Sequence, residues 1–396
     1  AGLIAVLVFL TLSLAILLPY FAFVLSFLSP VSVIGRLQGA AMAAIRNIGK
    51  KSIASSQEEF ITAVDELQDI ARRSAELGDR AVEMACIDAM FDLVLSYQPL
   101  IAALEKDAPD WFDVNGVVRN DPDFVSVNES SLATIRSERT WAEVKILRQY
   151  LDLVGDSRPG SRDASYLIAI NTRRMAIGGL EHRPDLELTN LCMRCFNSFL
   201  RATINKKDAR TGYYIMNHYR MLAEELLAKH EPDAAKNVAD YIHFYGLLGF
   251  EMGLPFLLEV AAEDVARLTS KCGPQDQELL DGLLDLVLNL DQELKEEFQS
   301  DSLLGVRRAQ IKLAAHLMEC GDEERAVRIC RDLEDEKPER LAKLFTILET
   351  EDRSEYWEFT DRGVNYSYLP ANLKAHLGTL ARMIRRRSDV EQLGDI

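Results

Sequence analysis

Apolar residues fill nearly every position at the start of the chain, and this pattern ends abruptly. From residue 1 to residue 35 there is no Asp, Glu, Lys, Arg or His. A helix needs about 20 apolar residues to cross the hydrocarbon core of a bilayer. The pattern therefore predicts a transmembrane segment over residues 1–30.

The next stretch, "VSVIGRLQGAAMAAIRNIGKK", has a different periodicity. At about 100° per residue its apolar side chains gather on one face and four cations gather on the opposite face. A basic amphipathic helix of this kind lies on a lipid surface with its cations at anionic headgroups. We expect a juxtamembrane helix over residues 31–54, unless its apolar face packs on the protein's own helices. The candidate lipid contacts are Arg36, Arg46, Lys50 and Lys51.

From residue 55 onward apolar residues recur every three or four positions, which predicts an all-α fold. The exception is "WFDVNGVVRNDPDFVSV", where Asn115 and Gly116 separate two β-prone runs. Asn-Gly is the preferred two-residue hairpin turn because both central positions need a positive φ. We therefore expect a helical domain over residues 55–155 that carries a small β-hairpin at about residues 110–128.

A polar break, "GDSRPGSRDAS", precedes a second series of helices. Within that series, "LAAHLMECGDEERAVRICRDLEDEKP" places small and apolar residues at the spacing of a tetratricopeptide repeat. The spacing predicts one antiparallel helix pair near residues 309–338. We expect residues 163–396 to form a helical repeat-like domain, an irregular solenoid or bundle of the kind that binds partner proteins.

The charges of the two regions differ in sign. Four cations precede the first acid, Glu58, whereas the whole chain has a formal net charge of −17. Positive flanks of a membrane span stay in the cytoplasm, so we expect the acidic body on that side of the membrane. The acidic balance argues against nucleic acid as a partner, because phosphates require Lys and Arg.

The sequence carries few signs of catalysis. It lacks the H-E-x-x-H, G-x-S-x-G, P-loop and G-x-G-x-x-G patterns. Cys192 and Cys195 form one C-x-x-C in a helical run, and the four other cysteines are scattered, so buried thiols compete with a redox or metal role. His316 and Cys320 lie one helical turn apart, where core packing competes with a shared metal. We expect no enzyme activity, catalytic residue, cofactor or metal.

Aromatic residues gather near the end of the chain in "EYWEFTDRGVNYSYLP". Aromatic side chains and Arg dominate the energetic centres of protein interfaces, although these rings could instead cap the helical core. The candidate partner-binding residues are Tyr356, Trp357, Phe359, Arg362, Tyr366 and Tyr368.

Three successive stretches carry a resemblance to a known family: "LPYFAFVLSFLSPVSVIGRLQ", "EEFITAVDELQDIARRSAELGDRAVEMACIDAM" and the segment around Asn115. In this order they resemble an uncharacterised bacterial family of predicted multi-span membrane proteins. The resemblance implies further spans upstream of Ala1 and a helical cytoplasmic domain, and it implies no activity.

Together these observations predict a membrane-anchored cytoplasmic scaffold or accessory subunit of a larger inner-membrane assembly. Its expected partners are the lipid bilayer and other proteins of the complex, or further copies of itself. The alternative is a channel or transporter subunit with a regulatory helical domain, although residues 1–35 hold no charge that would mark a conduction path.

Overall fold

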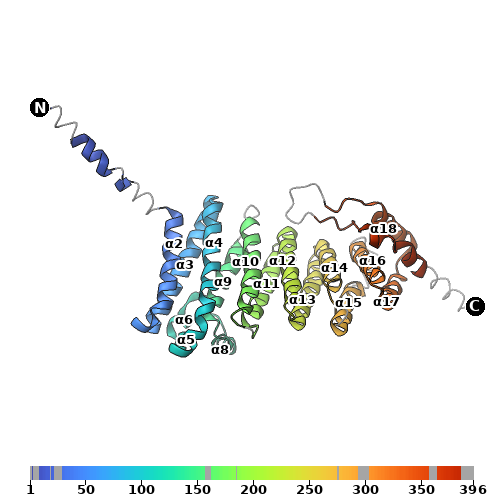
Figure 1. The fold of residues 1–396 in the computed structure, drawn as a ribbon, viewed down its shortest axis with the longest axis horizontal. Coiled ribbons are helices and arrows are strands. Elements are labelled where there is room, and N and C mark those ends of the chain that lie inside the picture. Colours follow the sequence, from blue (N-terminus) through green and yellow to red (C-terminus); the bar gives the residue numbers. More distant parts are fainter. Residues whose placement is uncertain are drawn as a thin grey trace, which may run out of the picture. The chain divides into compact units, whose positions relative to one another are not determined.

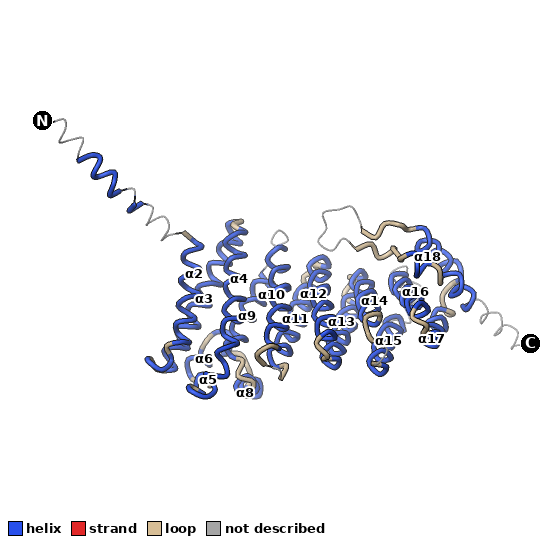
Figure 2. Tube along the Cα trace, viewed as in Figure 1, coloured by secondary structure: helices blue, strands red, loops and turns tan. Residues whose placement is uncertain are grey.

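The computed structural model describes residues 2, 9–17, 19–21, 29–156, 162–183, 185–273, 276–292, 303–355 and 364–384. These residues are almost entirely helices and loops, and β pairing among them is limited to an isolated bridge between Glu355 and Val364 (Figure 2). The predicted all-α class is therefore confirmed. The chain divides into two compact units, Ala1–Cys192 (unit 1) and Met193–Ile396 (unit 2).

From residue 30 onward unit 1 is built of helices, several of which are labelled in Figure 1. They are α2 (Pro30–Arg46), η1 (Ile48–Lys50), α3 (Ile53–Leu77), α4 (Arg80–Tyr97), η2 (Gln98–Leu100), α5 (Ile101–Asp107), η3 (Pro109–Phe112), α6 (Gly116–Asn120), α7 (Pro122–Val125), α8 (Glu129–Ser137), α9 (Trp141–Asp156) and α10 (Arg162–Leu180). The next helix, α11 (Glu187–Asn205), continues across the division into unit 2.

The core of unit 1 is built around α4, which packs against α2, α3, α9 and α10. Among the described residues one stretch, Arg80–Asp107, is long and apolar enough to cross a membrane by length and composition. However, 56% of its apolar window is buried inside the protein. The apolar side chains of this stretch therefore belong mostly to the core of unit 1. Half of the predicted transmembrane segment, residues 1–30, lies outside the described residues, and residues 9–17 and 19–21 are helical.

Helix α2 shows where the apolar face of the predicted juxtamembrane helix lies. Ile34, Ala41 and Ile45 are buried, and the helix packs on α3 and α4. The apolar face of α2 is thus used inside unit 1, as in the second of the two alternatives. The four candidate lipid-binding cations remain on its exposed side or in the turn that follows.

The predicted β-hairpin at residues 110–128 is wrong, because this segment forms η3, α6 and α7. Asn115 has φ −79° instead of the positive φ that an Asn-Gly hairpin turn needs. Its side-chain oxygen accepts hydrogen bonds from the backbone N–H groups of Val117 (2.9 Å) and Val118 (3.4 Å). Asn115 therefore acts as an N-cap, the other role for which Asn is favoured.

Aromatic packing holds this segment against the longer helices. The Trp111 ring lies 4.9 Å from that of Trp141, and the Trp141 ring lies 5.5 Å from that of Phe60, between centroids. The Trp141 indole N–H donates to the Trp111 carbonyl oxygen at 2.7 Å, and the Gln57 amide donates to the same oxygen at 3.0 Å. A β-strand pairing of residue 111 would lose these contacts.

Unit 2 consists of helices, most of which follow one another with short turns (Figure 1). They are α12 (Ala209–Ala228), α13 (Pro232–Glu251), α14 (Pro255–Thr269), α15 (Gln277–Gln292), α16 (Leu304–Glu319), α17 (Glu323–Leu333), α18 (Pro338–Thr350) and α19 (Ala371–Lys374). Each of α12 to α16 packs against the next helix, and α12, α14 and α16 also contact one another in sequence. This is repeat-like packing, in which each pair completes the core of its neighbour.

The helix pair predicted near residues 309–338 is confirmed as α16 and α17. Ala314 and Ala326 are buried between the two helices, where their small side chains allow close approach. Gly321 connects them with φ +80°, a left-handed conformation that side chains with a Cβ rarely adopt. The backbone thus reverses direction at the position expected from the sequence.

A buried arginine joins the last helices of this series. The Arg307 guanidinium lies 2.7 Å from the Asp291 carboxylate, 3.0 Å from that of Asp332 and 3.7 Å from that of Glu336. One cation thus faces three acids in a site from which water is nearly excluded. Burial raises the pKa of Asp291 to about 6, although Arg307 opposes this shift.

Substitution of Gly321 by Ala tests the left-handed turn. A Cβ at Gly321 would meet no atom within 4 Å, so the cost comes from the backbone alone, about 1 kcal/mol. Gly378→Ala is the matched control, because Gly378 also has open space but lies in a helix with no positive φ. We expect urea unfolding to show Gly321→Ala destabilised and Gly378→Ala stabilised by about 0.5–1 kcal/mol. Equal effects of the two substitutions would contradict the assigned turn.

The raised pKa of Asp291 predicts a pH dependence of stability. A carboxyl that binds its proton more tightly when folded stabilises the protein at low pH, and this contribution is lost as pH rises through about 6. Between pH 5 and pH 7 we expect the free energy of unfolding to fall by about 1 kcal/mol more in the wild type than in Asp291→Asn. Urea unfolding followed by circular dichroism measures both slopes. Identical slopes would show that Asp291 does not titrate in this range.

Candidate functional site

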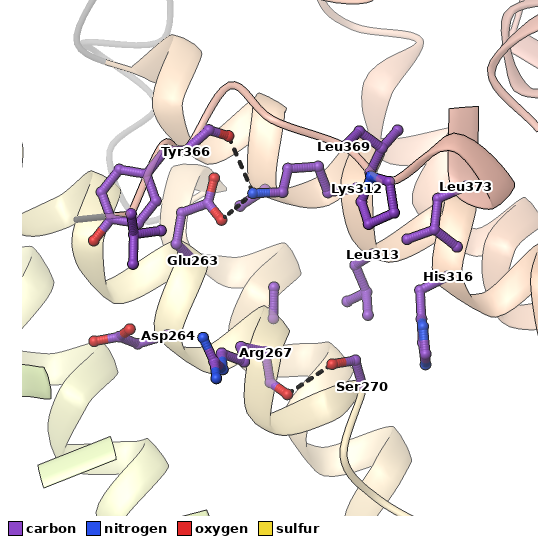
Figure 3. A pocket seen from close by; sticks show the side chains of 14 residues that line it. Glu263, Asp264, Arg267, Ser270, Lys312, Leu313, His316, Tyr366, Leu369 and Leu373 are labelled. Carbon is purple, nitrogen blue, oxygen red and sulfur yellow. Dashed lines mark hydrogen bonds and ion pairs between the residues drawn. The ribbon is translucent and has the colours of Figure 1, made fainter. Parts of the chain in front are cut away.

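A pocket lies in unit 2 between α14, α16 and the segment that follows residue 363 (Figure 3). We call residues 364–370 the strap, because they lie over both helices. The pocket has a volume of about 210 Å³. Its polar lining comes from Glu263, Asp264, Arg267, Ser270, Lys312 and His316.

Opposite charges on the two helices hold α14 and α16 together beside the pocket. The Lys312 ammonium lies 2.7 Å from one oxygen of Glu263, and the Arg308 guanidinium lies 3.4 Å from the other. Arg308 also pairs with Glu259. Burial lowers the pKa of Arg308, but the two carboxylates more than offset this effect, so the net pKa is raised and the cation is retained.

The same two cations hold the strap. Lys312 donates a hydrogen bond to the Tyr366 carbonyl oxygen at 3.1 Å, as Figure 3 shows. Arg308 lies 5.7 Å from the centre of the Tyr366 ring and donates to the Ser367 hydroxyl at 3.5 Å. The side chain of Leu369, also in the strap, is buried. The helices thus hold this segment, which turns at residues 366–367, through a main-chain oxygen, an aromatic face and one apolar anchor.

The remaining charged groups of the pocket are also paired. Arg267 lies 3.1 Å from Glu224, and Asp264 lies 3.2 Å from Arg220. His316 lines the pocket with its ring nitrogen 3.5 Å from the Cys320 sulfur.

A second cluster of ionisable residues lies in unit 1, around Lys145. The Lys145 ammonium is 2.6 Å from Asp65, 2.8 Å from Asp121 and 2.6 Å from Asp123. Three carboxylate oxygens this close together could bind a metal ion. The ammonium already occupies their centre, and the Lys145 side chain is 1% exposed. Burial lowers the pKa of Lys145, but the carboxylates outweigh it and raise the pKa overall.

The sequence did not identify this cluster, because its members come from α3, the α6–α7 turn and α9. One signal was available. Lys145 stands alone among apolar residues in "WAEVKILRQYL", at a position that the helical period places in the core. A buried Lys needs carboxylate partners.

The candidate residues taken from the sequence lie as follows. Tyr366 is buried against Arg308 in the strap and Tyr368 is half-buried, whereas Tyr356, Trp357, Phe359 and Arg362 lie outside the described residues. Arg36, Arg46, Lys50 and Lys51 are exposed, and Lys51 forms a 2.5 Å ion pair with Glu59.

The two cysteines of the C-x-x-C are buried thiols on α11. Neither belongs to a disulfide. Burial raises the pKa of the Cys195 thiol well above its ordinary value, which keeps it in the unreactive thiol form.

The fold and the site define an all-α protein with repeat-like packing. No known protein family matches the chain, and no curated protein matches it. A solved structure described as a circular tandem repeat protein with novel repeat topology and enhanced subunit contact surfaces is similar, with 13% sequence identity and a TM-score of 0.33. The alignment covers 91% of each chain.

Replacement of Lys145 by Met tests the carboxylate cluster. Removal of the ammonium leaves three carboxylates facing one another, which we expect to destabilise the protein by about 3–5 kcal/mol at pH 7. Repulsion raises the pKa of these groups, so the variant should regain stability as pH falls, and millimolar Ca²⁺ should also restore part of it. Urea unfolding at several pH values, with and without Ca²⁺, measures these effects.

Lys106→Met is the control for that substitution, because Lys106 is exposed. It should change the free energy of unfolding by no more than about 0.5 kcal/mol. Similar losses of unfolding free energy in the two variants would mean that the contacts of Lys145 with the three carboxylates do not stabilise the protein.

Proposed function

We propose that the protein is a membrane-anchored scaffold or accessory subunit of a larger inner-membrane assembly, acting by protein–protein interaction. The observation that carries the proposal is the strap on α14 and α16. These helices hold a turn-containing segment of the same chain through Lys312, Arg308 and the buried Leu369 of that segment. Helical repeat proteins use their layered faces in the same way to bind partners.

The start of the chain supports the membrane anchor. Phe9, Leu10 and Ile16 belong to its helical residues and are exposed, as are most of their described neighbours. Water solvates such a row of apolar side chains poorly, whereas a bilayer accommodates it. An apolar stretch of this kind in the described residues 9–21 is consistent with a span over residues 1–30.

The cations of α2 and η1 support a cytoplasmic position for the body. Since α2 packs its apolar face on α3 and α4, the helix offers lipid only its charged side. Arg36, Arg46, Lys50 and Lys51 are all exposed there. Their role would be electrostatic attraction to anionic headgroups, about 1 kcal/mol for each cation, without insertion of the helix.

Extraction of the full chain from its native membrane in a mild detergent tests this function. We expect native mass measurement to find a stoichiometric complex with other membrane proteins. A chain shortened by residues 1–30 is the control and should leave the membrane fraction. Recovery of the full chain as a lone monomer or homo-oligomer would contradict the scaffold function.

A further inference from the structure

Exposed apolar side chains of unit 2 concentrate on one face. Tyr241, Phe244, Met252 and Phe256 are 40%, 49%, 37% and 41% exposed. Among the described residues from 29 to 384, the other large hydrophobic side chains with comparable exposure are Val31, Leu77 and Val125, which are far apart in the sequence. Four of these seven residues thus fall within 16 consecutive positions. A concentration of exposed apolar side chains of this kind marks an interaction surface.

The spacing of these residues is that of a helix-packing stripe. Tyr241, Phe244 and Leu248 of α13 and its C-cap residue Met252 follow one another at intervals of three, four and four residues, and Leu248 is half-buried. Such a stripe spans about 16 Å of helix. In the cores of both units this pattern lies against a neighbouring helix, whereas here it faces outward.

Stacked rings hold the first residue of the stripe in place. The Phe196 and Tyr219 rings stack at 4.8 Å, and the Tyr219 and Tyr241 rings stack at 6.5 Å. Phe196 and Tyr219 are fully buried, so Tyr241 is the exposed end of a stack that begins in the core. Phe244 in turn lies edge-on to buried Tyr245 at 5.1 Å. Rings that are already ordered lose little conformational entropy on binding.

Cations border this stripe in an otherwise acidic chain. Residues 194–210 contain five Lys or Arg and one Asp, and Asp208 is used as the N-cap of α12. Lys207 donates to the Met252 carbonyl oxygen, and the Arg210 guanidinium lies 6.0 Å from the Tyr214 ring centre. Arg201 of α11 is close enough to Tyr245 of α13 to oppose the rise in its pKa that burial causes.

The cations of residues 194–210 and the apolar stripe meet at the beginning of α14. The Phe256 ring lies 5.5 Å from that of Tyr213, one turn after Arg210 in α12. We call this surface the aromatic–basic face. It comprises Tyr241, Phe244, Leu248, Met252 and Phe256 with Arg201, Lys207 and Arg210.

We propose that the aromatic–basic face binds an acidic amphipathic helix of a partner protein. The inference rests on the proposed scaffold function and names the chemistry of one partner segment. Apolar side chains of that helix, spaced at three and four residues, pack on the stripe. Its flanking carboxylates pair with the cations, whose field also steers the acidic segment toward this face.

A membrane is a poorer fit to the aromatic–basic face. The rings lie on the side of α13 and are half covered by neighbouring side chains, whereas residues that insert into a bilayer project from the surface into the headgroup region. The composition of aromatic residues, Met and Arg is that of the buried centre of protein interfaces. A helix can match a straight stripe of this length residue by residue.

Fluorescence anisotropy with a labelled synthetic peptide tests the proposal on the full chain in mild detergent. The probe has about 18 residues, with Leu at helical spacing and Glu on both flanks, and a second probe has Lys in place of Glu. We expect the Glu peptide to bind and the Lys peptide not to bind. Tyr241→Ser with Phe244→Ser should weaken binding about tenfold or more. Lys207→Glu with Arg210→Glu should do the same.

Two controls match these substitutions. Leu77→Ser removes a more exposed apolar side chain in unit 1, and Lys229→Glu reverses a charge at the opposite end of α12. Both should leave peptide binding unchanged. Absence of Glu-peptide binding, equal binding of both peptides, or equal loss in the controls would overturn the proposal. Binding of anionic vesicles or of a second copy that is lost in Phe244→Ser would also overturn it.

These outcomes are separate from failure of the scaffold function. If the Tyr241 and Phe244 substitutions leave the native membrane complex intact, the proposed binding of a partner helix to this face is wrong. The proposed scaffold function then still stands. If the wild-type chain forms no complex, the scaffold itself is wrong.

Discussion

The close contact between α13 and α14 is the constraint on which the architecture of unit 2 depends. A Cβ at Gly246 would lie 2.4 Å from that of Ala261, and one at Gly249 would lie 2.9 Å from that of Leu257. The two helices can therefore approach only because these positions lack side chains. That approach buries the inner face of α13 completely. It also fixes the outward direction of the opposite face, which carries Tyr241, Phe244 and Leu248.

The same division of a helix into a buried face and an exposed face recurs elsewhere in the chain. In α2 the apolar side packs inside unit 1 and the cations are exposed. On α14 and α16 the ion pairs that join the helices also hold the strap. Since each helix is fixed by its neighbours, such surfaces are rigid before any partner arrives. Rigid surfaces lower the entropic cost of binding, which suits an assembly subunit.

Sequence periodicity predicted what depends on local spacing and missed what depends on distant residues. The helical class and the α16–α17 pair follow from apolar residues at three and four positions and from Gly321. The hairpin failed because Asn favours both turns and N-caps, and only packing of Trp111 in the core selects the cap. Lys145 and its partners Asp65, Asp121 and Asp123 come from three separate segments, so no local pattern revealed the aspartates. Likewise, the stripe on α13 has the same period as a core face, and periodicity alone cannot tell the two apart.

Hydrogen–deuterium exchange of the chain in its native assembly, compared with the isolated chain, tests the central claim most directly. A partner bound to the helical layers should slow the exchange of backbone amides in the segment it covers, because local opening becomes costlier. We expect added protection concentrated in unit 2, over α13 and the first turn of α14. Equal exchange along the whole chain in both states would contradict the account of this protein as a scaffold.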